Sequence, residues 1–264
     1  MPSLSFDPMA HAYDATRTYD EASFAAALAH LLERFPPHAF PRVLEPGIGT
    51  GRIALPLAQQ GYEVWGIDIS VQMLAILRQR LTQPGYPVRM TLHRADACHL
   101  PFRAEAFDLG LAVHLFYFIS AWRQAVQELL RVVRADGSLV LMHTGMGKEI
   151  PWINERYKAL CAAQGFPIPP MGVQSTNEVI AYCRALGCAV ESIRDRWPWT
   201  SQIPLGEALT DVRAQAYSFT TMVPPHIHAE AVRQLEGEVR ARYGSVTRTV
   251  EVPNQISFVF VRKR

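Results

Sequence analysis

The sequence lacks the features that mark secreted, membrane-spanning and nucleic-acid-binding proteins. Its four cysteines form no C-x-x-C motif and no Cys/His grouping, which predicts reduced thiols, no metal site and a cytoplasmic location. The first ten residues lack the charged and apolar regions of a signal peptide. No apolar run approaches the roughly 18 residues of a membrane span. The net charge of +2 lacks the basic excess of a dedicated nucleic-acid binder.

The most informative stretch of the 264 residues is the glycine-rich segment Glu45-Pro46-Gly47-Ile48-Gly49-Thr50-Gly51. An apolar strand pattern precedes it, and a helical pattern of apolar residues follows it from Ile53. Glycine reaches positive φ cheaply and lets a ligand lie against the backbone. The helix behind the turn offers free N–H groups and a partial positive charge. The segment therefore predicts a nucleotide-type binding turn between a strand and a helix.

The spacing of the glycines excludes two common nucleotide sites. A dinucleotide fingerprint requires G-x-G-x-x-G after a strand, but Arg52 occupies the position of its third glycine. A phosphate-binding P-loop requires a lysine after its last glycine, and no lysine follows here.

The next two strand patterns also end in an acidic residue. The pattern over residues 63–68 ends at Asp68, and the pattern over residues 88–97 contains Asp96 near its end. In an open parallel sheet the carboxyl ends of the strands face the ligand crevice. A carboxylate at Asp68 can accept both ribose hydroxyl protons, although this residue could instead cap the helix that follows Ser70. The sequence therefore has a strand and a glycine turn, followed by two further strands with an acidic residue at or near the end, which is the order expected of a nucleotide-binding α/β sheet.

These motifs resemble those of the class I S-adenosylmethionine-dependent methyltransferases, of the methyltransferase-11 type. The glycine turn is similar to their first motif, and Ala95-Asp96-Ala97 followed by Leu100-Pro101-Phe102 is similar to their G/A-D-A-x-x-L-P-F signature. The run around Ala135-Asp136-Gly137 resembles their L-x-R-V-L-x-P-G-G motif, with two departures that lie outside the cofactor site. The resemblance covers roughly residues 40–145 and weakens over the last hundred residues.

The resemblance implies an α/β fold, with a doubly wound, mostly parallel seven-stranded sheet and a helical insertion before the last strand. We expect one domain over residues 1–264, with an N-terminal lid and helix at 1–36, a cofactor-binding core at 40–145 and a helical cap at 200–245. S-adenosylmethionine is the implied cofactor and S-adenosylhomocysteine the product. The implied reaction is in-line methyl transfer to a small-molecule acceptor by a monomer or homodimer, with no nucleic-acid or membrane partner.

The same resemblance implies the cofactor contacts. Gly47 and Gly49 lie against the methionine moiety, Asp68 binds the ribose, and Asp96 accepts a hydrogen bond from the adenine amine. Glu45 orients the glycine turn or the cofactor's ammonium group through a water. The remaining expected contacts lie beside these positions: Ile48, Ile69, Met73, Ala97 and Val113.

A polar, aromatic and basic segment precedes the first strand. It contains Tyr13, Asp14 and Arg17, and segments of this kind often fold over the cofactor in the family that this chain resembles. We expect Tyr13 and Arg17 to close over the cofactor, with Arg17 pairing with its methionine carboxylate. The alternative is a solvated arm on the surface.

The fourth strand pattern, over residues 107–113, ends in His114. This position places His114 near the transferred methyl group, where an imidazole could remove a proton from the acceptor near neutral pH. Proximity alone can sustain methyl transfer, so His114 could equally be a wall of the pocket or a structural residue. Tyr117, about one turn further, is an expected substrate contact.

Large aromatic residues in the later part of the chain indicate a roof over the substrate pocket. We expect Trp152, Trp197 and Tyr217 to form an apolar wall of the acceptor pocket, the alternative being core packing or a dimer face. Two other functions stay open at this stage. A protein that binds S-adenosylmethionine or S-adenosylhomocysteine without catalysis is one, and an NAD-dependent oxidoreductase, disfavoured by the glycine spacing, is the other.

Overall fold

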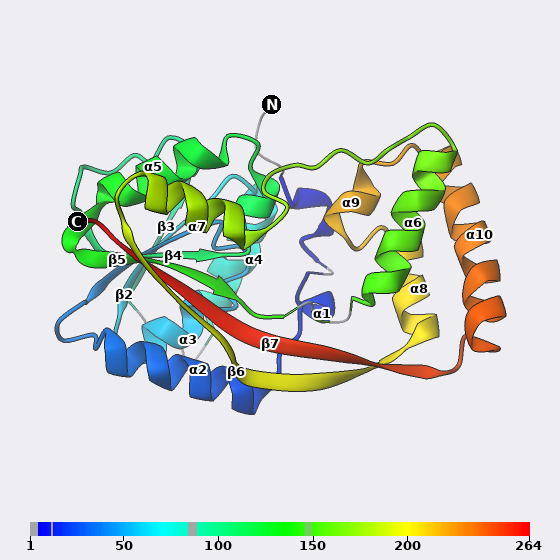
Figure 1. Ribbon diagram of the computed structural model, residues 1–264. Helices are drawn as coiled ribbons and strands as arrows, with labels where there is room; N and C mark the ends of the chain where they lie inside the picture. Colours follow the sequence, from blue (N-terminus) through cyan, green and yellow to red (C-terminus); the bar gives the residue numbers. More distant parts are fainter. Residues whose placement is uncertain (1–4, 12, 84–88, 146, 148) are drawn as a thin grey trace.

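A twisted, mostly parallel sheet forms the centre of the computed structural model, which describes residues 5–11, 13–83, 89–145, 147 and 149–264 (Figure 1). Within these residues the sheet has seven strands in the order β3-β2-β1-β4-β5-β7-β6. The strands are β1 Arg42–Pro46, β2 Glu63–Asp68, β3 Met90–Arg94, β4 Phe107–Val113, β5 Val133–His143, β6 Ala189–Pro204 and β7 Thr249–Arg262. The first five pair in parallel, and β7 runs antiparallel to both β5 and β6. This arrangement confirms the predicted fold class.

Helices cover both faces of the sheet because its central strands are apolar on both sides. Six of the seven residues of β4 are buried, as expected of a strand that is covered on both faces. Helices α2, α3 and α4 pack on one face, and α5 and α7 pack on the other (Figure 1). Their bounds are α2 Glu21–Arg34, α3 Ala54–Gln59, α4 Val71–Leu81, α5 Trp122–Val132 and α7 Thr176–Ala185.

Side-chain caps fix where several of these helices begin. The Asp20 carboxylate accepts the N–H of Ser23 at the start of α2, and the Ser70 hydroxyl accepts the N–H of Met73 at the start of α4. Ser175 and Glu178 form a capping box at the start of α7. The start of α4 matters for the site, because α4 follows directly on Asp68 at the end of β2.

The last two strands extend well beyond the rest of the sheet and connect to a separate group of helices (Figure 1). We call this group the cap, which consists of α6 Pro151–Ala163, α8 Leu205–Arg213, α9 Ser218–Thr221 and α10 Pro225–Tyr243. The cap has its own hydrophobic cluster, built on α6, α8, α10 and the far ends of β6 and β7. Helices α8, α9 and α10 all lie between β6 and β7 in the chain.

Two strands include residues that usually interrupt a sheet. Strand β7 is continuous through Pro253, because it stays paired with β6 on both sides of the proline. Strand β5 begins at Val133 and so includes the Ala135-Asp136-Gly137 run. The expected start of the third strand at Val88 lies outside the described residues. Among the described residues, no helix is both long enough and apolar enough to cross a bilayer.

Candidate functional site

The turn after β1 places its backbone at the carboxyl edge of the sheet. Gly47 and Gly51 adopt φ angles of +68° and +80°, which side chains rarely tolerate. A Cβ at Gly47 would lie 2.8 Å from Leu115 Cδ1, and a Cβ at Gly51 would lie 2.4 Å from Leu77 Cδ1 of α4. The glycines therefore let the turn pass close to α4 on one side and to the segment after β4 on the other.

Asp68 fastens this turn to the end of β2. Its Oδ2 accepts the N–H of Gly49 at 2.9 Å, and its Oδ1 accepts the N–H of Ser70 at 2.8 Å. Burial raises the pKa of Asp68, and the hydrogen bonds from Ser70 and Gly49 oppose that rise. A carboxylate has about four acceptor positions, so two bonds leave capacity for a ligand.

A pocket lies along this edge and encloses about 640 Å³ of empty space, part of it open to solvent. Ten of the predicted site residues line it: Tyr13, Gly47, Gly49, Asp68, Ile69, Met73, Asp96, Ala97, Val113 and His114. Five residues that were not predicted as contacts also line it: Phe6, Ala95, Leu115, Phe118 and Ile119. Leu115 and Phe118 belong to the 3-10 helix η2 Leu115–Phe118, and Ile119 directly follows it. The run of apolar residues after His114 was the signal that could have identified them.

The segment before α2 crosses the glycine turn and closes one side of the pocket. We call it the arm, and it comprises residues 5–11 and 13–20, with η1 at Asp7–Met9 and α1 at Tyr13–Thr16. The Asp7 carboxylate accepts the Ser70 hydroxyl at 2.5 Å and the N–H of Gln72 at 3.0 Å. The Asp14 carboxylate accepts the Thr50 hydroxyl at 2.6 Å and pairs with Arg80. These bonds hold the arm against the start of α4 and the glycine turn.

His114 lies on the pocket wall in a left-handed conformation with φ of 50°. Its Nε2 accepts the N–H of Thr144 at 3.0 Å and lies 3.2 Å from the Thr144 hydroxyl. Burial lowers the pKa of His114 well below its usual value, and His143, Arg52 and Arg17 lower it further. The imidazole is therefore neutral with its proton on Nδ1, because Nε2 is the acceptor.

His143, at the end of β5, forms a second buried imidazole beside the first. Its ring centroid lies 4.9 Å from that of His114 in an edge-to-face arrangement. Burial and the charge of Arg194 lower the pKa of His143 to about 4. Its Nε2 lies 2.6 Å from the Thr176 hydroxyl, which in turn lies 3.0 Å from the Tyr117 hydroxyl. Tyr117 thus braces η2 against α7 and does not line the pocket.

These two histidines predict a loss of stability in mild acid. Between pH 6.5 and the lowered pKa of about 4 for His143, the unfolded chain binds protons that the folded chain does not. The free energy of unfolding should therefore fall as the pH falls through this window. We expect His143→Asn to reduce the difference between urea unfolding at pH 7 and at pH 5 by about 1–2 kcal/mol. If the difference in free energy of unfolding between pH 7 and pH 5 were the same in His143→Asn and wild type, the lowered pKa of His143 would be contradicted.

Two predicted cofactor residues lie behind the pocket wall rather than on it. Glu45 is 3% exposed, and its Oε2 has no hydrogen-bond partner among the described residues. Burial raises the pKa of Glu45 well above its usual value, an effect that Arg52 opposes. Ile48 packs on Gly66 of β2, where a Cβ would lie only 2.2 Å from Ile48 Cδ1. The side chain of Ile48 therefore supports the glycine turn from behind.

Arg17 also lies off the pocket, on the cap side of the arm. Its Nη1 lies 3.3 Å from Glu149 Oε1 and forms no hydrogen bond within the described residues. Its guanidinium carbon lies 5.8 Å from the centre of the Tyr13 ring, which does line the pocket. Tyr13 therefore lines the pocket whereas Arg17 stands behind it, and closure of Tyr13 over the cofactor stays a prediction.

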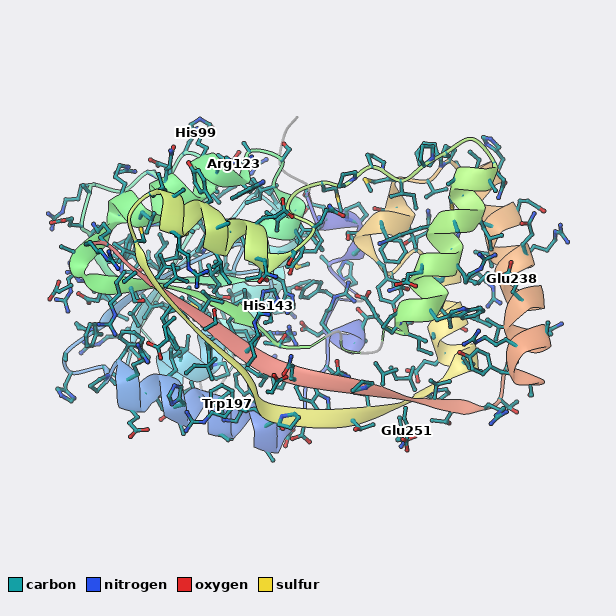
Figure 2. All side chains as sticks on the ribbon, viewed as in Figure 1. His99, Arg123, His143, Trp197, Glu238 and Glu251 are labelled. Carbon is teal, nitrogen blue, oxygen red and sulfur yellow. The ribbon has the colours of Figure 1, made fainter. Side chains whose placement is uncertain are left out.

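The three aromatic residues of the expected roof do not line the pocket. Trp197 is 7% exposed and packs in the core, with its ring 5.3 Å from His30 of α2 and 5.4 Å from Phe258 of β7. Figure 2 shows Trp197 beside α2, away from His143. The role predicted for Trp197 is therefore corrected to core packing.

Trp152 and Tyr217 belong to the cap. The Trp152 ring contacts Tyr243 of α10 at 5.8 Å, which corrects its predicted role to packing between α6 and α10. Tyr217 is buried in the cap cluster, stacks on Phe219 at 5.7 Å and donates its hydroxyl to Asp211 at 3.3 Å. Its ring also faces Arg17, so it is the residue of the expected roof that meets the arm.

Comparison with known proteins shows what the core of this chain is similar to. Residues 44–141 match the sequence profile of a family described as a methyltransferase domain. Over 102 residues the chain is 37% identical to a phosphatidylethanolamine N-methyltransferase of Cereibacter sphaeroides, covering 39% of this chain and 50% of that protein. Over 103 residues it is 38% identical to a demethylmenaquinone methyltransferase of Thermus thermophilus, covering 38% of this chain and 46% of that protein. The matched part thus spans about half the length of these curated relatives.

Solved structures show that the likeness in fold extends beyond the matched segment. The YcgJ protein of Bacillus subtilis superposes with a TM-score of 0.61 at 19% sequence identity, covering 91% of this chain and 99% of that one. At this identity the comparison shows the fold alone. Residues 44–141 match a methyltransferase domain, and the pocket lies at the carboxyl edge of that segment, whose motifs resemble those of the class I S-adenosylmethionine-dependent type.

Proposed function

We propose that this protein binds S-adenosylmethionine in the pocket at the carboxyl edge and transfers its methyl group to a small-molecule acceptor. The single observation that carries the proposal is the fixed geometry of Asp68. Its carboxylate holds the glycine turn through Gly49 and at the same time lines the pocket. The turn and the acidic strand end therefore form one binding unit.

The residues present fit this cofactor. Gly47 and Gly49 present backbone without side chains, where the methionine part requires close approach. Asp68 would hold the ribose hydroxyls and Asp96 the adenine amine, with Ile69, Met73 and Ala97 supplying apolar contacts. Arg17 lies behind Tyr13 with its Nη1 beside Glu149, so we do not assign it to the methionine carboxylate. The buried Glu45 would act through the turn.

The bound cofactor supplies an electrophilic methyl group on its sulfonium. The protein's own residues then have to orient the acceptor and exclude water. Phe6 and Tyr13 of the arm and Phe118 of η2 provide the apolar walls for this. Phe6 bridges the other two, with its ring 5.9 Å from that of Tyr13 and 4.9 Å from that of Phe118.

We expect His114 to contribute to the pocket wall rather than to act as a general base. A base at Nε2 would need the lone pair that already accepts the N–H of Thr144. Once an acceptor is known, His114→Asn should lower turnover by less than about tenfold. A loss of about 10²-fold or more, with cofactor affinity intact, would instead establish general-base catalysis.

The acceptor is the part of the proposal that needs a direct test. The relatives named above act on different acceptors, one a phosphatidylethanolamine and the other a demethylmenaquinone. A screen of small amines, lipids with amine headgroups, phenols and quinols should therefore be read by release of S-adenosylhomocysteine. We expect release with at least one class, and none with DNA or RNA. Tight cofactor binding without release for any class would favour a non-catalytic cofactor-binding protein.

A further inference from the structure

An ion pair that is largely shielded from solvent joins the arm to the cap. Arg17 of the arm lies beside Glu149, which directly precedes the α6 region of the cap, with 3.3 Å between Nη1 and Oε1. The two side chains are only 16% and 13% exposed. The other carboxylate oxygen of Glu149 accepts the amide N–H of Asn154 in α6 at 2.6 Å. Glu149 is therefore anchored to the cap while it faces the arm.

Aromatic rings on both sides complete the environment of Arg17. Its guanidinium carbon lies 5.1 Å from the centre of the Tyr217 ring in the cap and 5.8 Å from that of the Tyr13 ring in the arm. Both distances lie in the range of cation–π attraction. Tyr13 lines the pocket, so the chain of contacts runs from the pocket wall through Arg17 to the cap.

Backbone packing fixes the same junction. The carbonyl oxygen of Arg17 accepts a hydrogen bond from the Arg52 guanidinium, which also donates to the Thr144 hydroxyl at 3.1 Å. A Cβ at Gly147 would lie 2.5 Å from the carbonyl oxygen of Thr16, so the segment before α6 packs directly on the arm backbone. The arm is thus held between the glycine-turn side of the core and the entry to the cap.

The effect of removing the Glu149 charge follows from the free energy of buried ion pairs. Such a pair adds little net stability over an apolar replacement, but removing one partner leaves an uncompensated buried charge. Loss of the Glu149 charge would leave the Arg17 guanidinium without a carboxylate, and Arg17 would then tend to leave the junction for solvent. Because Arg17 is on the arm, that movement would disturb Tyr13 at the pocket.

We propose that Glu149 is a positioning residue that holds the arm closed over the pocket through Arg17, so that arm and cap close as one unit. This proposal rests on the proposed function in one respect, because one of its tests measures the binding of S-adenosylhomocysteine. Glu149 itself does not line the pocket, and its effect is exerted on Tyr13 and the rest of the arm.

The test compares Glu149→Gln with wild type and with Glu238→Gln. Glutamine keeps an oxygen that can accept from Asn154 but has no charge opposite Arg17. Glu238→Gln is the matched control, because it removes the carboxylate partner of Arg156 in α6. Glu238 belongs to α10, on the outer side of the cap (Figure 2). We expect Glu149→Gln to weaken S-adenosylhomocysteine binding by about three- to tenfold in calorimetry, and Glu238→Gln to leave it unchanged. Amide hydrogen exchange of residues 13–20 should be faster only in Glu149→Gln.

A double-mutant cycle separates positioning through Arg17 from a general effect on the cap. In an Arg17→Met background, Glu149→Gln should have no further effect on binding or on exchange in the arm. Equal binding and exchange in Glu149→Gln and wild type would overturn the proposal, as would full additivity in the cycle. If wild type itself fails to bind S-adenosylhomocysteine, the proposed function fails, and the exchange comparison still tests the role of Glu149.

Discussion

Asp68→Ala should weaken S-adenosylmethionine binding by about a hundredfold. Loss of one charge-assisted hydrogen bond costs about 1.5–3 kcal/mol, or roughly tenfold to hundredfold in affinity. In this chain the same carboxylate also accepts the N–H groups of Gly49 and Ser70. The substitution therefore removes the ribose contact and loosens the glycine turn together, which places the expected loss at the upper end of that range. Isothermal titration calorimetry measures it directly.

Two further variants separate the loss of the Asp68 contacts from the general effect of removing a carboxylate. Asp136→Ala removes a 77% exposed carboxylate of β5 and should bind the cofactor as wild type does. Asp68→Asn keeps one oxygen that can accept from Gly49, so it should retain more affinity than Asp68→Ala. Wild-type affinity in Asp68→Ala would remove the ribose assignment.

Gly172→Ala should lower the free energy of unfolding by about 3 kcal/mol, at the upper end of the cost of overpacking. A Cβ there would lie 2.0 Å from the carbonyl oxygen of Phe116, 2.8 Å from the carbonyl carbon of Tyr117 and 3.0 Å from the carbonyl oxygen of Ile119. All three atoms are backbone, so no side-chain rotation can relieve the contacts. The backbone at Gly172 or the segment carrying Leu115, Phe118 and Ile119 has to move, and these three residues line the pocket.

Thermal unfolding tests this prediction. A loss of about 3 kcal/mol corresponds to a fall in Tm of about 6–12 °C for a chain of this size. Gly237→Ala is the matched control, because a Cβ at this position in α10 meets nothing within 4 Å. It should keep or raise the Tm, since alanine favours a helix interior over glycine. Equal stability of Gly172→Ala and wild type would show that η2 is not held by this contact.

The sequence predicts the core well because its signals there are local. Each of these signals depends on a few adjacent residues: the glycine turn, the strand that ends at Asp68, and Ser70 as the N-terminal capping residue of α4. The fold that they imply is confirmed. Parallel topology then brings the strand ends to one edge without further information. Asp68 and Asp96, though far apart in the chain, line the same pocket for this reason.

The outer part of the site depends on contacts that adjacent residues do not encode. Strand β6 shifts its register between Ile193 and Trp197, and its Trp197 ring packs beside α2 rather than over the pocket. No local pattern marks that irregularity. His114 could be placed on the pocket from its position at the end of β4, but its bond with Thr144 comes from a residue 30 positions later. Its neutral, hydrogen-bonded state therefore had to come from the structure.

The most direct test of the central claim is a calorimetric titration of the purified wild-type protein with S-adenosylhomocysteine. Saturable binding at one site per chain, lost in Asp68→Ala and retained in Asp136→Ala, is the result that we predict. A folded wild-type protein that gives no binding heat at millimolar ligand, with no stabilisation by the ligand in thermal unfolding, would contradict the assignment of this pocket.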